Sequence, residues 1–173
     1  KGKTSGDLWT VCRELSCRML MLAGIGDKDE CGRLVDEAVE SGEALKRFEM
    51  MVKLQGGDVS YIEDTSKFRK ASFSREVYAP ADGYITHMDS EKIGLTAVLL
   101  GAGREKKDDD INHAAGIIIA AKTGDFVKRG ELLATLLADD ESRLDGAESR
   151  YLSAVSIGDK KPAEQPMILD YID

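Results

Sequence analysis

The chain has 173 residues, of which 42% are hydrophobic and 32% charged, and its formal net charge is −8. This composition predicts a soluble globular protein whose apolar residues suffice for a core without disulfide staples. The negative charge without a basic patch argues against nucleic-acid binding, and the lack of a long apolar run argues against a membrane span.

The three cysteines, Cys12, Cys17 and Cys31, are an odd number for a chain of this size. They predict free thiols and a cytoplasmic location rather than a disulfide framework. The sequence starts Lys-Gly-Lys, with no initiator methionine and no apolar signal segment. We therefore expect a fragment of a longer protein, although a processed terminus would read the same way.

Helical spacing dominates the first third of the chain. The first expected helix follows Ser5 as its N-cap and ends at Gly24, and it carries one apolar stripe. The stripe consists of Leu8, Val11, Cys12, Leu15, Met19 and Leu22. A second helix is expected from near Asp27 or Asp29 to Gly42, burying Cys31, Leu34, Val35 and Ala38.

A third helix is expected from about Glu43 to Gln55, with Leu45, Phe48, Met51 and Val52 facing inward.

Residues 58–71 are polar, and we expect them to form a segment that connects two regions of the chain. The period then changes to the alternation typical of strands. Strands are expected at residues 73–79, 84–88, 115–121, 126–127, 132–137 and 167–172, and helices at 90–100 and 140–155. Both 115–121 and 132–137 read as buried strands, and Val155 is placed on the apolar face of the last helix.

The loop at residues 101–110 holds the strongest candidate for a ligand contact. Gly101 and Gly103, one residue apart, would let the backbone approach a ligand closely, and Arg104 would present a planar fork to an anion. The alternative is a flexible turn that ends a helix.

Other possible sites have weaker support. Lys3-Thr4 resembles only the tail of a phosphate-binding loop, and Asp108-Asp109-Asp110 lacks the ligand spacing of a calcium loop. His87 and His113 have no paired spacing with each other or with the cysteines, so we expect no metal site. His113 stays open as a functional loop residue.

Residues 122–133 form a K-x-G-D-x-V-x-x-G-E-x-L string, with two turns that frame short strands. This string is structural and occurs in barrel-sandwich hybrid folds, including biotinyl and lipoyl carriers. A carrier needs a lysine flanked by methionine, or by aspartate and alanine, on an exposed hairpin. Neither Met-Lys-Met nor Asp-Lys-Ala occurs in the sequence, so the carrier alternative lacks its working residue.

An ordered series of strings resembles the pyrimidine-nucleoside phosphorylase and thymidine phosphorylase family over nearly the whole chain. The strings are Gln55-Gly56-Gly57-Asp58 and those at residues 79–85, 88–94, 99–104, 109–111, 115–117 and 122–133. The series departs from the family pattern at Leu137-Ala138-Asp139, a position that we take as structural.

This resemblance implies an α+β fold in two parts. Residues 1–71 would be the helical end of the central phosphate-binding α/β domain, and residues 72–173 a C-terminal α/β-hammerhead, barrel-sandwich-like domain. The implied activity is reversible phosphorolysis of a pyrimidine nucleoside to free base and sugar 1-phosphate. The implied enzyme is a cytoplasmic homodimer.

Three functional segments of the family precede the region matched here. They are the phosphate loop, the Arg, Ser and Lys set that binds the base, and the segment that binds a monovalent cation. No catalytic, substrate-binding or metal-binding residue can therefore be carried over, and we expect no cofactor in this chain and no activity of it alone. We expect the loop at 101–110, with Gly101, Gly103 and Arg104, to reach toward the cleft of the full enzyme. A phosphorylase acting on nucleotides is a further alternative.

Overall fold

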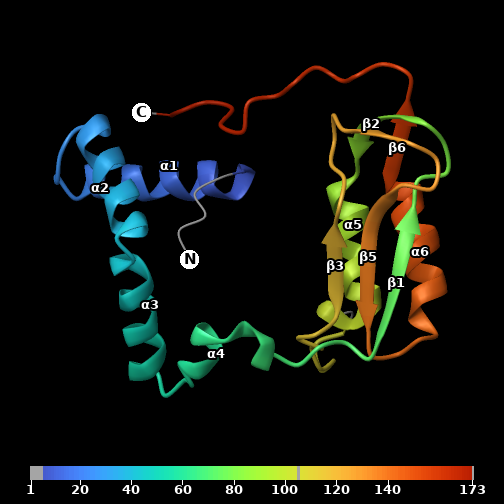
Figure 1. Cartoon of the computed structure of the whole chain (residues 1–173), viewed down its shortest axis with the longest axis horizontal. Helices are drawn as coiled ribbons and strands as arrows, with labels where there is room; N and C mark the ends of the chain where they lie inside the picture. Colours follow the sequence, from blue (N-terminus) through green and yellow to red (C-terminus); the bar gives the residue numbers. More distant parts are fainter. Residues whose placement is uncertain (1–5, 105, 173) are drawn as a thin grey trace. The chain divides into compact units, whose positions relative to one another are not determined.

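The computed structural model describes residues 6–104 and 106–172, which form two compact units. The first unit contains the chain up to Phe68 together with the segment that starts at Gln165, and the second unit spans Arg69–Glu164. Figure 1 shows helices in the first unit and both strands and helices in the second. The fold is mixed α+β, as the sequence predicts at this level.

The first unit is helical. Asp27 caps the second helix, because its carboxylate accepts a hydrogen bond of 2.9 Å from the backbone N–H of Glu30. The helices are α1 (Asp7–Leu22), α2 (Lys28–Glu40) and α3 (Glu43–Leu54), followed by the short turns α4 (Ser60–Glu63) and η1 (Thr65–Lys67). Their bounds agree closely with the expected helices. Ser5, the expected N-cap of α1, lies outside the described residues.

The contact between α1 and α2 is small and partly polar. Cys17 from α1 and Cys31 and Val35 from α2 are buried there. Arg13 donates two hydrogen bonds to Asp36, of 2.6 and 2.7 Å, across the two helices. A Cβ at Gly32 would lie 2.8 Å from the Arg13 guanidinium, so glycine at this position leaves room for the ion pair.

Several apolar residues of this unit are exposed, contrary to the expectation for α3. Phe48 and Met51 were expected to face inward, but 48% and 46% of their surfaces are exposed, and α3 buries no residue completely. Helical spacing identified the apolar faces of the helices. Spacing alone could not show whether a neighbouring element covers each face.

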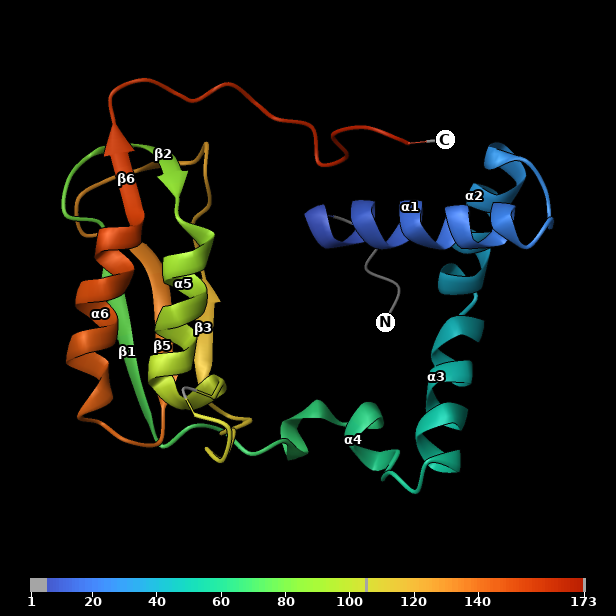
Figure 2. The ribbon, with the colours of Figure 1, turned by 180° about the vertical axis from the view of Figure 1, so that it is seen from behind.

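The second unit contains two three-stranded antiparallel sheets, in the strand orders β1-β5-β3 and β4-β2-β6. Figures 1 and 2 show α5 and α6 on one face of the β1-β5-β3 sheet. The strands are β1 (Phe73–Tyr78), β2 (Gly83–Met88), β3 (Gly116–Ile119), β4 (Phe126–Val127), β5 (Leu132–Ala138) and β6 (Val155–Gly158). The helices are α5 (Ser90–Ala97), the π-type turn η2 (Val98–Ala102) and α6 (Arg143–Ala154).

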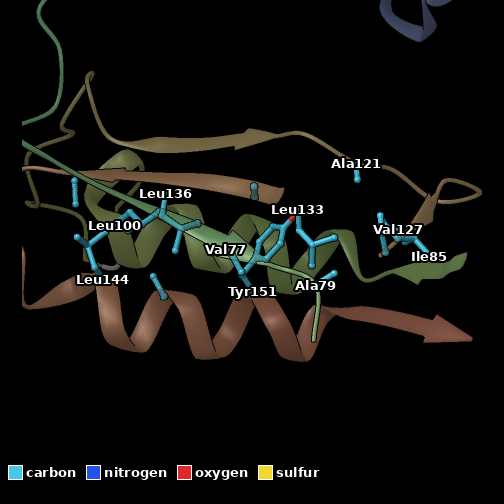
Figure 3. Packing of buried hydrophobic residues seen from close by; sticks show 13 residues of the cluster. Val77, Ala79, Ile85, Leu100, Ala121, Val127, Leu133, Leu136, Leu144 and Tyr151 are labelled. Carbon is cyan, nitrogen blue, oxygen red and sulfur yellow. The ribbon is translucent and has the colours of Figure 1, made fainter. Parts of the chain in front are cut away.

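The core of this unit lies between α6 and the sheets. Leu144, Ala147 and Tyr151 project from α6, and each is at most 2% exposed. Figure 3 shows the Tyr151 ring among Val77 and Leu133 of the β1-β5-β3 sheet. Burial of this continuous apolar cluster is the main favourable term for folding of the unit.

The string at residues 122–133 forms two similar turns. The Asp125 carboxylate accepts a hydrogen bond of 2.7 Å from the backbone N–H of Lys122, and the Glu131 carboxylate accepts one of 2.8 Å from that of Lys128. The acidic residue that ends each turn thus also caps its start. In the first turn, Gly124 lies between Lys122 and Asp125. Its φ of 94° is in the left-handed region, which explains why glycine occupies that position.

Three strand predictions need correction. The segment 115–121 was expected to be buried, but β3 is an edge strand whose Ile118 and Ile119 are exposed. Val155 begins β6 instead of ending the last helix, because it pairs with Met88 of β2. Residues 167–172 form no strand. In the described part of the chain, no helix is both long and apolar enough to cross a membrane.

Candidate functional site

The loop that contains Gly101, Gly103 and Arg104 leaves the end of α5 through a tight backbone turn. Gly101 is buried and has φ 108° and ψ 3°, in the left-handed region that glycine adopts readily. At Gly103 the backbone is extended, but a Cβ would lie 2.7 Å from Cγ2 of Val98. Both glycines therefore have a structural role, while the side chain of Arg104 is exposed.

The far end of this loop is fixed by Asn112. Its backbone N–H donates to the carbonyl of Gly101 at 2.9 Å, which closes the loop on itself. Its side-chain oxygen accepts hydrogen bonds from the backbone N–H of Ala114, at 3.0 Å, and from the guanidinium of Arg69, at 2.7 Å. The loop from 101 to 115 is thus tied both to its own start and to the segment that enters the second unit.

Asp139, directly after β5, completes a polar cluster at the base of the loop. Its carboxylate accepts hydrogen bonds from the backbone and the hydroxyl of Ser72, at 2.8 and 2.9 Å, and from the amide of Asn112 at 2.8 Å. It also accepts one from Arg69. We call Arg69, Ser72, Asn112 and Asp139 the polar cluster.

The electrostatics of the polar cluster favour the ionised form of Asp139. Hydrogen bonds from the backbone and hydroxyl of Ser72, and then the one from Arg69, lower the pKa of Asp139 to about 2. The negative charge is therefore present throughout the physiological pH range. It holds together three segments that are far apart in the sequence.

A second arginine borders the loop beside Gly101. Nη1 of Arg143, from the first turn of α6, donates to the carbonyl of Leu99 at 3.2 Å, and its Nε donates to Asp140 at 3.3 Å. A Cβ at Gly101 would lie 3.7 Å from Nη1 of Arg143. Arg69 and Arg143 both donate hydrogen bonds that fix the loop, and Arg104 within the loop is exposed.

The other residues considered from the sequence are not members of the polar cluster. His87 and His113 are exposed. Asp109 accepts a hydrogen bond of 2.8 Å from the backbone N–H of Lys106, as in a turn. Within residues 6–104 and 106–172, no group of three histidine, cysteine or acidic side chains is arranged to hold a metal ion. Lys3 and Thr4 lie outside the described residues.

The cysteines belong to the first unit and are not part of the loop. Cys12 is exposed, Cys17 and Cys31 are buried, and all three are free thiols. The thiol of Cys17 donates to the carbonyl of Lys28 at 3.3 Å, and that of Cys31 to the carbonyl of Gly26 at 3.5 Å. Burial raises the pKa of Cys31, which makes it less reactive than an exposed thiol.

The polar cluster was not predicted from the sequence. Asp139 belongs to the string that departs from the family pattern, and the sequence predicts no joint role for Arg69, Ser72 and Asn112. One local signal existed, because an asparagine two residues before Ala114 suits a turn in which its side chain accepts the later N–H. Nothing local marks the partnership of Arg69 with Asp139, which are 70 residues apart.

Comparison with known proteins finds a family similar to part of the second unit. Residues 84–158 match the family described as Pyrimidine nucleoside phosphorylase C-terminal domain. This match covers β2 except its first residue, strands β3–β6, helices α5 and α6, the loop with Asn112, and Asp139 after β5.

Curated relatives match over a longer range. A pyrimidine-nucleoside phosphorylase from Bacillus subtilis (strain 168) is 38% identical over 143 residues, which cover 82% of this chain and 33% of the relative. One from Staphylococcus aureus (strain bovine RF122 / ET3-1) is 35% identical over 160 residues, which cover 92% of this chain and 37% of the relative. The chain thus spans about a third of the length of these relatives. Residues 84–158 are thus similar to the Pyrimidine nucleoside phosphorylase C-terminal domain family, and the longer range is similar to a part of these pyrimidine-nucleoside phosphorylases.

Proposed function

We propose that the chain is the C-terminal part of a cytoplasmic, homodimeric pyrimidine-nucleoside phosphorylase. That enzyme would convert a pyrimidine nucleoside and phosphate into the free base and a sugar 1-phosphate. The observation that carries the proposal is the family match of residues 84–158, extended by relatives that are 35–38% identical over most of the chain. In this proposal residues 1–71 end the central phosphate-binding domain, and residues 72–173 form the α/β-hammerhead domain.

The chain by itself would be inactive. Phosphorolysis requires a cradle of N–H, hydroxyl and ammonium donors around the phosphate dianion, and cationic groups for the departing base. The family's K-x-S-x-G-G phosphate loop does not occur in the 173 residues. The catalytic groups would belong to the two thirds of the relatives that this chain does not match.

Within such an enzyme, the loop at 101–110 would face the substrate cleft. Its base is fixed by Asn112 and Asp139, and its first residues are shaped by Gly101 and Gly103. The side chain of Arg104, in the same loop, is exposed and can approach an anionic group. Arg104 would then contribute to binding phosphate or to charge stabilisation when the cleft closes.

A fusion protein tests the activity. The part of the Bacillus subtilis relative that this chain does not match would be joined to the 173 residues and assayed with phosphate and uridine, thymidine or a pyrimidine nucleotide. We expect turnover of a nucleoside. Turnover of the nucleotide alone would favour the nucleotide phosphorylase. A folded fusion without any phosphorolysis would reject the proposal.

Replacing Arg104 in that fusion tests the role of the loop. Arg104→Ala should lower kcat/KM about tenfold or more, because a charged hydrogen bond to the substrate would be lost. Arg150→Ala, at an exposed position on α6, serves as the matched control and should leave kcat/KM unchanged. Equal kinetics of the two variants would remove Arg104 from the site.

The two turns at residues 122–131 keep one alternative open, a carrier of the biotinyl or lipoyl type. They have the paired form typical of barrel-sandwich folds, and each begins with a lysine, Lys122 or Lys128. A carrier would gain a biotinyl or lipoyl adduct on one lysine when produced with a carrier ligase. An unmodified mass of the intact chain would exclude this function.

A further inference from the structure

Helix α1 presents an apolar stripe to solvent. Leu8, Leu15, Met19 and Leu22 are 77%, 60%, 69% and 90% exposed, and Cys12 between them is exposed as well. The five positions alternate in steps of four and three residues, which places them on one face of the helix. Single exposed apolar residues are ordinary, but a contiguous row of this kind marks an interaction surface.

The contact of α1 with α2 does not use this stripe. Cys17 is buried there, and Arg13 pairs with Asp36 on the same side. Among residues 6–68 and 165–172 of the first unit, the stripe therefore stays exposed, although its residues have the size and spacing of core residues. The sequence of α1 is amphipathic, so its apolar face is suited to burial. The face is exposed because no element of the described unit packs against it.

A second apolar surface of the same unit lies between α3 and η1. A groove of about 600 Å³ is lined mainly by apolar and aromatic side chains. They are Phe48, Val52, Tyr61, Ile62 and Phe68. The rings of Tyr61 and Phe68 meet edge to face at 5.1 Å between centroids. The groove is thus a shaped surface and not a scatter of exposed side chains.

We infer that the α1 stripe and the α3 groove are docking surfaces for the part of a pyrimidine-nucleoside phosphorylase that this chain does not match. The inference rests on the proposed function, since it takes the occupant from the relatives. Those relatives are about three times the length of the matched region, so most of their chain is available to cover this unit. The occupant presents an apolar face of its own to each surface.

A second copy of the chain is a poorer occupant. The stripe from Leu8 to Leu22 covers about two heptads, whereas a coiled coil between helices is indicated by at least three to four. Each copy also carries a net charge of −8, which opposes association of two copies at low ionic strength. The stripe therefore fits one face of a larger domain better than its own duplicate.

Cys12 provides a probe of the docking within the stripe itself. It is an exposed free thiol, whereas Cys17 and Cys31 are buried. In the isolated 173-residue chain, a maleimide should label Cys12 rapidly. In the fusion with the unmatched part of the Bacillus subtilis relative, labelling of the peptide that contains Cys12 should slow at least about tenfold, because only local opening exposes the thiol.

Substitutions separate docking from folding. Leu15→Ser with Met19→Ser should restore rapid labelling of Cys12 in the fusion, and Phe48→Ser with Phe68→Ser should lower the melting temperature of the fusion. Neither pair should change the melting temperature of the isolated chain by much, because these residues are exposed there. Leu95→Ser, at an exposed position of α5, is the matched control and should keep Cys12 protected.

Three results would overturn the inference. Equal labelling of Cys12 in the isolated chain and the fusion would show that the stripe stays open. Protection in the isolated chain, with a dimer that Leu15→Ser with Met19→Ser dissociates, would assign the stripe to a second copy. Protection in a monomeric isolated chain would assign it to this chain itself. Phosphorolysis by the fusion is measured separately, so loss of activity with Cys12 protected would reject the function and keep the docking.

Discussion

At the base of the loop from 101 to 115, the carboxylate of Asp139 accepts hydrogen bonds from Ser72, Arg69 and Asn112. These partners come from the entry to the second unit and from the loop, so a single side chain joins segments that the sequence separates widely. A carboxylate that accepts several hydrogen bonds is stabilised in its charged form, which explains why its pKa falls to about 2.

The lowered pKa of Asp139 leads to a pH-dependent prediction. Its folded pKa lies below the unfolded value of about 3.9, so its contribution to stability is present above that value and is lost as the pH falls toward 2. Asp139→Asn should lower the melting temperature by roughly 4 °C at pH 7 and by much less near pH 2. Thermal unfolding at both pH values measures this, with Asp159→Asn at an exposed position as the control. A pH-independent difference would contradict the prediction.

A pair of glycines tests the backbone of the loop. Gly101→Ala places a side chain at a φ of 108° and should destabilise the chain by about 1–2 kcal/mol. Gly94→Ala is the matched control, because Gly94 lies within α5 with open space around it and should gain up to about 1 kcal/mol. Urea unfolding of both variants, followed by far-UV circular dichroism, gives the comparison. Equal effects would mean that the left-handed backbone at Gly101 is not required.

Among the elements, α6 contributes most clearly to the core of the second unit. Its inward face consists of Leu144, Ala147, Tyr151 and Ala154, all buried. The salt bridges of Arg75 with Asp145 and Glu148 join β1 to the same helix at its solvent side. The helix is therefore held by burial on one face and by surface ion pairs on another, and burial is the larger contribution.

The Tyr151 side chain is completely buried, and its hydroxyl has no hydrogen-bond partner in the described part of the chain. Burial also raises the pKa of this phenol. Tyr151→Phe should therefore stabilise the chain by about 1 kcal/mol, because the cost of an unsatisfied buried hydroxyl is removed and the ring remains. Tyr151→Ala should cost about 3–5 kcal/mol through the cavity it leaves. A loss of stability on Tyr151→Phe, measured by urea unfolding, would mean that the hydroxyl has a partner.

The two units of the chain differ in how much apolar surface they bury. The buried residues of the helical unit are few, chiefly Cys17, Cys31 and Val35, whereas those of the second unit form one continuous cluster. Stability follows the apolar area removed from water, so the two units should unfold separately.

Trp9 makes this difference measurable, because it is the single tryptophan of the chain and lies in α1. Its fluorescence should change at a lower urea concentration than the far-UV signal of the sheets. Tyr151→Phe should move only the later transition, which assigns that transition to the second unit. Coincident transitions from both probes would show that the two units unfold as one.

Local patterns in the sequence predicted the helices of the first unit, most strands of the second, the two turns at residues 122–131 and the resemblance to the phosphorylase family. These features depend on periodicity, capping residues and turn residues within a few positions of each other, so they are readable locally. The candidate loop was located in the same way, through Gly101, Gly103 and Arg104.

Which apolar faces are covered, and which distant groups meet, depends on the packing of elements that are far apart in the sequence. Val155 joins β6 because β2 is there to pair with it, and β3 is exposed because it lies at a sheet edge. Residues 167–172 have strand-like composition but no strand beside them in the described chain, so they stay irregular. Asp139 contacts Arg69 because β1 pairs with β5, which brings the two residues together. They are 70 residues apart, so no local pattern in the sequence predicts their contact.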